Sequence, residues 1–407
     1  MEHALHLLLI ILAARLFGEA AVRLRQPALV GEIVAGMGLA LLASTFAGIP
    51  ALARLPDSPF LEIAAEFGIF FLLLYAGMEM RPAELAKNSG TSLAVAFGGM
   101  IVPLLAGFAL AWVFLPETPF RSAQSLLVGV ALSISAVPVT ARLFQELGLL
   151  HERVGRTVMS AAIFDDVFGL VLMAVLVAII ESGDTLGMQA TFWLLAQVGA
   201  FFAITITIGV YAYPLLGRLM GRFRIPAFQL SSLLVLALAY SMIAEAMGMD
   251  FILGPFMAGL FFDRKVIGKQ QYAETRASVS ALTDGLLGPL FFASIGVRLD
   301  LDAVVAIPGF LAALLLVAFL GKLLGAGIPA RLAGLSNREA ATVGIGLSGR
   351  GAVELIIASI ALEAGLLDQP DTIVSNLFSA IVIVAVITTL VTPIVLRWML
   401  GKHEHPG

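Results

Sequence analysis

Residues 156–181 read RTVMSAAIFDDVFGLVLMAVLVAIIE, an apolar run with the adjacent aspartates Asp165 and Asp166 near its middle. The run exceeds the roughly 20 residues that an α-helix needs to cross a bilayer. An ionised side chain at that depth costs at least about 2.5 kcal/mol, so it marks an ion or proton pathway by default. The stretch therefore predicts a membrane-spanning helix that carries a buried acidic site.

The composition of the whole chain agrees with a membrane protein. Of its 407 residues, 60% are hydrophobic and only 13% are charged, whereas a soluble protein has roughly 25% charged residues. The net charge of −4 leaves no basic surface for nucleic acid, and the lack of cysteine excludes disulfides and thiolate metal sites. The first apolar run contains Arg15 and Glu19 and no small-residue cleavage site, so we expect no cleaved signal peptide.

Apolar runs of spanning length recur along the chain, and we predict an all-α polytopic membrane protein with about 13 transmembrane helices. They cover residues 4–22, 28–47, 61–80, 91–115, 122–144, 156–181, 190–217, 226–247, 249–263, 280–298, 304–329, 338–363 and 374–399. With the N-terminus outside, the cytoplasmic loops hold 18 Lys and Arg residues and the outer loops three. The positive-inside rule thus predicts a multi-pass protein of a bacterial inner membrane with a cytoplasmic C-terminus.

Two pairs of short motifs indicate an internal repeat. Residues 30–36 (VGEIVAG) resemble 253–259 (LGPFMAG), and residues 72–78 (LLLYAGM) resemble 291–297 (FFASIGV). The offsets of 223 and 219 residues are nearly equal, and they span seven helices, so the two halves enter the membrane from opposite sides. We predict a single transporter domain, 1–407. It comprises repeat one (about 4–181), a linker helix (about 190–217) and repeat two (about 226–399), the inverted-repeat architecture of secondary transporters.

Three further charges lie inside apolar segments: Lys322, Arg350 and Glu354. Lys322 lies roughly 10 Å and Asp165 roughly 13 Å from the cytoplasmic ends of their segments, at 1.5 Å per residue. One aspartate is therefore expected to pair with Lys322, and the other stays available as a hard oxygen ligand. Such a carboxylate can hold a proton or a cation but not both well, which is the minimum that an exchanger needs. A purely structural salt bridge is the alternative, although one lysine cannot neutralise two aspartates.

Two segments are predicted to be interrupted helices that could cross each other. Segment 122–144 contains Ser135, Pro138 and Thr140, and a proline inside a helix removes a hydrogen bond and frees a carbonyl oxygen for a cation. Its repeat partner, 338–363, is rich in glycine, which disfavours a continuous helix. Arg350 and Glu354 are four residues apart there, so we expect an ion pair within that segment.

The residues quoted so far, with two further stretches, are similar to a known family. Residues 26–36 (QPALVGEIVAG), residues 140–148 (TARLFQELG), the Asp165–Asp166 pair and Lys322 resemble the second family of monovalent cation:proton antiporters over essentially the whole chain. The resemblance implies 13 helices divided into a dimerisation domain and a core domain that moves like an elevator. It also implies that Asp166 binds the cation and the proton alternately.

The resemblance further implies that Asp165 pairs with Lys322, whose proton would make the exchange electrogenic. The transported Na⁺ or K⁺ and H⁺ are then the substrates, no cofactor is expected, and the partners are the lipid bilayer and a second copy of the chain. The sequence departs from close sodium/proton relatives at two positions, which leaves open whether Na⁺ or K⁺ is transported. Ser135 is followed by alanine rather than a second hydroxyl, and Glu354 stands two positions later than the family's Arg-Gly-Glu motif.

Three other classes fit the sequence less well. An intramembrane aspartyl protease needs two aspartates on separate helices, whereas these are adjacent, so we expect no enzyme. A sodium-coupled organic-solute symporter could use the broken helices but has no need of the Asp165, Asp166 and Lys322 set. A channel requires weak and multiple sites rather than a buried titratable pair.

Overall fold

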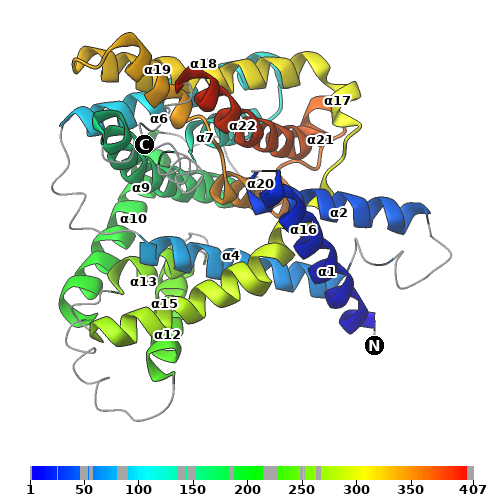
Figure 1. Cartoon of the computed structure of the whole chain (residues 1–407), viewed down its shortest axis with the longest axis vertical. Coiled ribbons are helices and arrows are strands. Elements are labelled where there is room, and N and C mark those ends of the chain that lie inside the picture. Colours follow the sequence, from blue (N-terminus) through cyan, green and yellow to red (C-terminus); the bar gives the residue numbers. More distant parts are fainter. Residues whose placement is uncertain are drawn as a thin grey trace, which may run out of the picture. The chain divides into compact units, whose positions relative to one another are not determined.

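The computed structural model describes residues 2–24, 26–45, 54, 58–79, 90–135, 144, 152–182, 188–213, 227–247, 251, 253–262 and 267–400. Within these ranges every regular element is a helix (Figure 1), which confirms the all-α expectation. Eight of the described helices are long and apolar enough to cross a membrane. The chain is thus a multi-pass membrane protein, and the count of 13 spans remains a prediction.

The chain divides into two compact units, each formed by two separate stretches. Unit 1 comprises Met1–Pro82 and Leu186–Leu299, and unit 2 comprises Ala83–Thr185 and Asp300–Gly407. Unit 1 contains α1 (Glu2–Arg23), α2 (Ala28–Thr45), α4 (Pro59–Glu79), α10 (Met188–Thr207), η1 (Ile208–Ala212), α12 (Phe228–Ala246), α13 (Leu253–Phe261), α15 (Lys269–Leu282), η2 (Thr283–Leu287) and α16 (Gly288–Arg298). Unit 2 contains α6 (Gly90–Phe114), α7 (Arg121–Ser133), α9 (Arg153–Ser182), α17 (Ala303–Ala306), α18 (Pro308–Leu332), α19 (Asn337–Gly346), α20 (Ala352–Glu363), α21 (Thr372–Ser375) and α22 (Leu377–Leu400).

Most helices begin and end within a few residues of the predicted segments, and the largest difference is at α15. Helices α15, η2 and α16 run on from one another as one helix from Lys269 to Arg298 (Figure 1), whereas the apolar pattern placed the start near residue 280. The extra turns are polar and carry Lys269, Glu274 and Arg276. Hydropathy alone ends a span where the apolar residues end, although the helix itself continues into water.

The two segments that were expected to be interrupted are interrupted. Helix α7 ends at Ser133, and Ile134 is extended. A proline at position 138 explains this end, because its ring clashes with the carbonyl of the residue four positions earlier and it cannot donate to that carbonyl. In the second segment, α19 ends at Gly346 and α20 begins at Ala352. Ser336 and Glu339 form a capping box that fixes the start of α19.

Glycines allow very close helix contacts in unit 1. A Cβ atom on Gly36 of α2 would overlap the carbonyl oxygen of Ala293 on α16, and one on Gly296 of α16 would overlap the carbonyl oxygen of Ile33. In a membrane, helices associate through van der Waals contact rather than the hydrophobic effect, so small residues at the crossing points stabilise the pair.

Helices α4 and α13 make a second contact of the same kind. A Cβ atom on Gly77 of α4 would overlap the carbonyl oxygen of Phe256, and one on Gly259 of α13 would overlap the carbonyl oxygen of Leu74. The repeat offsets found in the sequence relate the two contacts residue by residue. The offset of 223 converts positions 33 and 36 into 256 and 259, and the offset of 219 converts 74 and 77 into 293 and 296.

These contacts predict a position-specific effect of adding a methyl group to α2. We expect Gly36→Ala to destabilise the protein by roughly 1–3 kcal/mol, because the new methyl group requires backbone atoms to move apart. Gly38 lies on the same helix and an added Cβ there meets no atom within 4 Å. Gly38→Ala should therefore be neutral or stabilise by up to about 1 kcal/mol. Thermal unfolding of the two variants in detergent measures the difference, and equal midpoints would contradict the packing.

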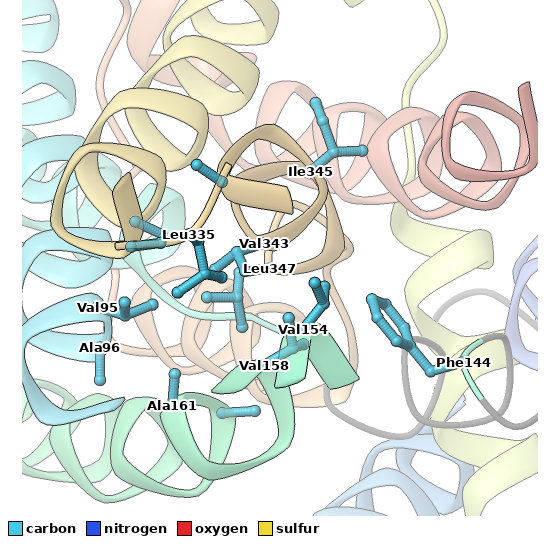
Figure 2. Close-up of a cluster of buried hydrophobic side chains, with 14 of the residues drawn as sticks. Val95, Ala96, Phe144, Val154, Val158, Ala161, Leu335, Val343, Ile345 and Leu347 are labelled. Carbon is cyan, nitrogen blue, oxygen red and sulfur yellow. The ribbon is translucent and has the colours of Figure 1, made fainter. Parts of the chain in front are cut away.

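The buried apolar core of unit 2 joins α6, α9, α18, α19 and α22. Figure 2 shows side chains of α6 (Val95), α9 (Val158 and Ala161) and the α19 region (Val343 and Leu347) converging on one another. These five residues are at most 2% exposed. This packing holds α9 and α18, which carry Asp165 and Lys322, against α19, the first part of the second interrupted segment.

Candidate functional site

A buried ion pair joins α9 and α18 within unit 2. The Lys322 ammonium lies 3.1 Å from Oδ2 and 3.3 Å from Oδ1 of Asp165. The two residues are 0% and 2% exposed. At 1.5 Å per residue, Asp165 is roughly 18 Å from the start of α9 and Lys322 is roughly 15 Å from the end of α18. The sequence left open which aspartate Lys322 contacts; in the structure it contacts Asp165, the one that the resemblance implies.

Close backbone packing fixes the position of Lys322. On α18, a Cβ atom at Gly321 would lie 2.9 Å from the Pro103 side chain of α6. On the α19 side, a Cβ atom at Gly344 would lie 3.1 Å from the carbonyl oxygen of Lys322 itself. Residues larger than glycine at 321 or 344 would push these helices apart. The packing therefore fixes the backbone position from which the Lys322 side chain reaches Asp165.

The neighbouring aspartate, Asp166, follows Asp165 within α9. Successive positions of an α-helix are about 100° apart around its axis. The side chain of Asp166 and the whole of Thr140 lie outside the described part of the structure. Their cation-binding roles stay predictions.

Arg350 connects the two interrupted segments. Its Nη1 donates to the carbonyl oxygen of Ala131 at 2.7 Å, and its Nη2 donates to that of Leu132 at 3.0 Å. Both carbonyls belong to the last turn of α7, where the four final carbonyls of a helix have no partner within the helix. A second, longer bond joins Nη2 to the carbonyl oxygen of Ala318 on α18 at 3.5 Å. The guanidinium also offsets the partial negative charge at the end of α7.

Glu354 lies in the first turn of α20, four residues after Arg350, which precedes that helix. Its Oε2 is 3.8 Å from Arg350 Nη1, which is close enough for an ion pair. Neither oxygen of this buried carboxylate accepts a hydrogen bond from the described residues. The expected pair therefore exists as a charge interaction, while the donors of Arg350 that form bonds serve the backbone instead.

Ser135 lies just beyond the end of α7. It is 5% exposed, and its hydroxyl has no hydrogen-bond partner among the described residues. A buried hydroxyl without a partner costs free energy, so this oxygen is available to a ligand. Ser135 was the one hydroxyl predicted as a cation ligand that the described residues include.

Sequence reasoning missed the contribution of α22 to the site. The Thr389 hydroxyl donates to the carbonyl oxygen of Arg350 at 2.6 Å and so holds the break between α19 and α20. The hydroxyl of Thr392 is also buried, and no described residue bonds to it. Thr388, Thr389 and Thr392 followed by Pro393 form a polar cluster inside an otherwise apolar span. That cluster could have indicated from the sequence that this helix contributes to the site.

Unit 1 contains a separate buried carboxylate. Glu32 on α2 is 4% exposed, and Arg15 Nη1 on α1 lies 4.0 Å from its Oε1. It belongs to the stretch 26–36 that carries part of the family resemblance. It lies in unit 1, whereas Asp165, Lys322, Arg350 and Glu354 lie in unit 2.

Buried opposite charges beside two interrupted helices, in a chain of repeated apolar spans, define a membrane transporter of ions. A family model described as sodium/hydrogen exchanger, transmembrane, matches residues 8–402. The chain belongs to this family, which is one of cation/proton antiporters rather than enzymes.

Two bacterial relatives match over almost their whole length. The Na(+)/H(+)-K(+) antiporter GerN of Bacillus cereus is 31% identical, over 99% of this chain and 97% of the relative. A Na(+)/H(+) antiporter of Enterococcus hirae is 25% identical over 99% of both chains. The fold is similar to the solved structure of the sodium proton antiporter MjNhaP1 from Methanocaldococcus jannaschii, with a TM-score of 0.73 at 19% identity. That similarity covers 98% of this chain and 97% of the other.

Proposed function

We propose that this chain is a secondary active antiporter that exchanges protons for Na⁺, with Li⁺ as a second substrate, by competition at Asp166. The observation that carries the proposal is the Lys322–Asp165 pair, buried at mid-helix next to a second aspartate in sequence. Lysine neutralises one carboxylate and leaves the other to bind one positive ligand at a time. Ser135 and Thr140 are the proposed hydroxyl ligands. The hydroxyl of Ser135, to which no described residue bonds, supports its role.

Potassium is the second candidate ion. The name of GerN includes K⁺ together with Na⁺, whereas that of the Enterococcus hirae relative includes Na⁺ alone. Glu354 also stands where the sequence departs from close sodium/proton relatives. Both observations support testing K⁺ beside Na⁺ and Li⁺.

The transport cycle that we propose is an elevator movement of one unit in a homodimer, with the N-terminus outside and the C-terminus in the cytoplasm. The division into two units supports it, since each predicted repeat contributes its first helices to unit 1 and its later helices to unit 2. The related glycine contacts of α2 with α16 and of α4 with α13 support two inverted repeats. Repeats of this kind place a substrate site at the repeat interface near the membrane midplane.

Competition predicts a particular dependence on pH. As the pH falls, protons occupy the aspartate more often, so the apparent KM for the cation should rise. One pH unit in the acidic limb should raise it by up to about tenfold for one competing proton, and the maximal rate at saturating cation should change less. Proton flux from proteoliposomes over a range of cation concentrations and pH values measures both. A KM that is independent of pH would contradict a shared site.

A further inference from the structure

Glu354 is a buried carboxylate to which no described residue donates a hydrogen bond. It is 1% exposed, and both of its oxygens lack a hydrogen-bond partner among the described residues. Buried ionised groups are otherwise paired and hydrogen-bonded, because desolvation of a lone carboxylate is costly. Asp165 shows the ordinary arrangement, with the Lys322 ammonium within 3.3 Å of both oxygens. Among the described residues, Glu354 therefore lacks the hydrogen-bonding cationic partner that Asp165 has in the same unit.

Arg350 does not supply the missing donor. Its hydrogen bonds go to the carbonyl oxygens of Ala131, Leu132 and Ala318. It approaches only Oε2 of Glu354, at 3.8 Å, which leaves Oε1 without a close positive charge among the printed contacts of the described residues. The other described charge that acts on Glu354 is that of Lys322, which is held by Asp165.

Helix α22 contributes further oxygens, one of them in contact with this break. The Thr389 hydroxyl bonds to the backbone of Arg350. Pro393 lies four residues further along α22 and has no N–H, so the Thr389 carbonyl oxygen cannot receive the usual helical hydrogen bond. The Thr392 hydroxyl is buried, again with no partner in the described residues. Carboxylate, carbonyl and hydroxyl oxygens are the ligands that hard cations prefer.

The charged residues inside the apolar segments of unit 2 can be neutralised by one monovalent cation. When ionised, Asp165, Asp166 and Glu354 carry three negative charges against the two positive charges of Lys322 and Arg350, so together they carry one net negative charge. One alkali-metal ion neutralises the group. Since Asp165 is committed to Lys322, the remaining carboxylates are those of Asp166 and Glu354.

We propose that Glu354 is a further ligand for the transported alkali-metal ion, acting at the break between α19 and α20 and determining which ion is preferred. This inference rests on the proposed antiport function and goes beyond it by adding a carboxylate outside the aspartate pair. Oxygen ligands differ in how well they suit ions of different size. A second carboxylate on a different helix thus changes the preference for Na⁺, Li⁺ or K⁺ as well as the affinity.

The test compares Glu354→Gln with Glu363→Gln in the full chain. Glu363 is on the same helix but exposed at its end, so it matches the chemistry of the change without the buried position. Each protein is assayed for proton flux in proteoliposomes and for the rise of its thermal midpoint in detergent on adding Na⁺, Li⁺ or K⁺. We expect Glu354→Gln to raise the half-maximal concentration of the preferred ion at least tenfold in both assays, and Glu363→Gln to leave it unchanged.

Glu354→Asp provides a second variant that retains the charge. The shorter side chain should alter the ratio of the half-maximal concentrations for K⁺ and Na⁺ by at least threefold. Values within twofold of the wild type for all three ions in both variants would overturn the inference and leave the antiport function intact. A wild type that shows neither cation-driven flux nor a thermal shift would instead overturn the proposed function, and the role of Glu354 with it.

Discussion

Replacing Lys322 by alanine is expected to destabilise the protein by about 3–5 kcal/mol, because it leaves the Asp165 carboxylate buried without its positive partner. Unfolding of the detergent-solubilised or reconstituted protein by sodium dodecyl sulfate measures the free energy. The thermal midpoint should fall in parallel. We also expect cation-driven proton flux to be lost, since an uncompensated Asp165 would compete for the cation and the proton.

A double substitution separates the charge effect from the loss of side-chain volume. Lys322→Met together with Asp165→Leu removes both charges and retains apolar bulk, which is often neutral or stabilising for a buried ion pair. We expect this double variant to recover most of the stability lost in Lys322→Ala without recovering transport. If Lys322→Ala unfolds like the wild type, the pair contributes nothing to stability and the central electrostatic argument is wrong.

Replacing Arg350 by alanine is the second change with a large expected effect. It would leave the carbonyl oxygens of Ala131 and Leu132 without donors and remove the counter-charge of Glu354. Hydrogen bonds to charged groups contribute about 1.5–3 kcal/mol each, so the loss of two is expected to cost roughly 3–6 kcal/mol. Because these bonds hold the end of α7 just before Ser135, transport should fall together with stability.

Two controls test whether the fork geometry of Arg350 matters. Arg350→Lys keeps the charge but has a single ammonium that cannot reproduce the planar fork, so its stability should lie between wild type and alanine. Arg338 also donates to a backbone carbonyl, that of Met399, but it does so at an exposed position. Arg338→Ala should cost about 1 kcal/mol or less. Equal losses in Arg338→Ala and Arg350→Ala would contradict the role of Arg350 at the end of α7.

The apolar pattern could predict the helical class and most helix positions because a bilayer imposes a length on every span. It also indicated both interruptions, through Pro138 in one segment and the glycines before Ala352 in the other. It placed the start of α15 too late, since polar turns that continue a helix into water carry no hydropathy signal. The position of such a polar helix end depends on tertiary contacts rather than on composition.

Part of the site was predictable for similar reasons. Intramembrane charges are costly, so Asp165, Lys322, Arg350 and Glu354 stand out in any apolar stretch. The hydrogen-bond partners of these residues were harder to predict from the sequence. Spacing indicated that Arg350 should face Glu354, but its bonds to the α7 carbonyls depend on the crossing of helices distant in sequence. The same holds for Thr389, whose contact with Arg350 joins residues 39 positions apart.

The most direct test of the central claim is cation-driven proton flux in proteoliposomes that hold an imposed pH gradient, with Asp166→Asn as the control. Asparagine keeps the size of the side chain but cannot hold a proton or match the charge of a cation. The account predicts that Na⁺ or Li⁺, and K⁺ if the second candidate ion is correct, dissipates the gradient in the wild type. The folded variant should show no such flux. Equal flux in the wild type and Asp166→Asn would contradict exchange at this aspartate.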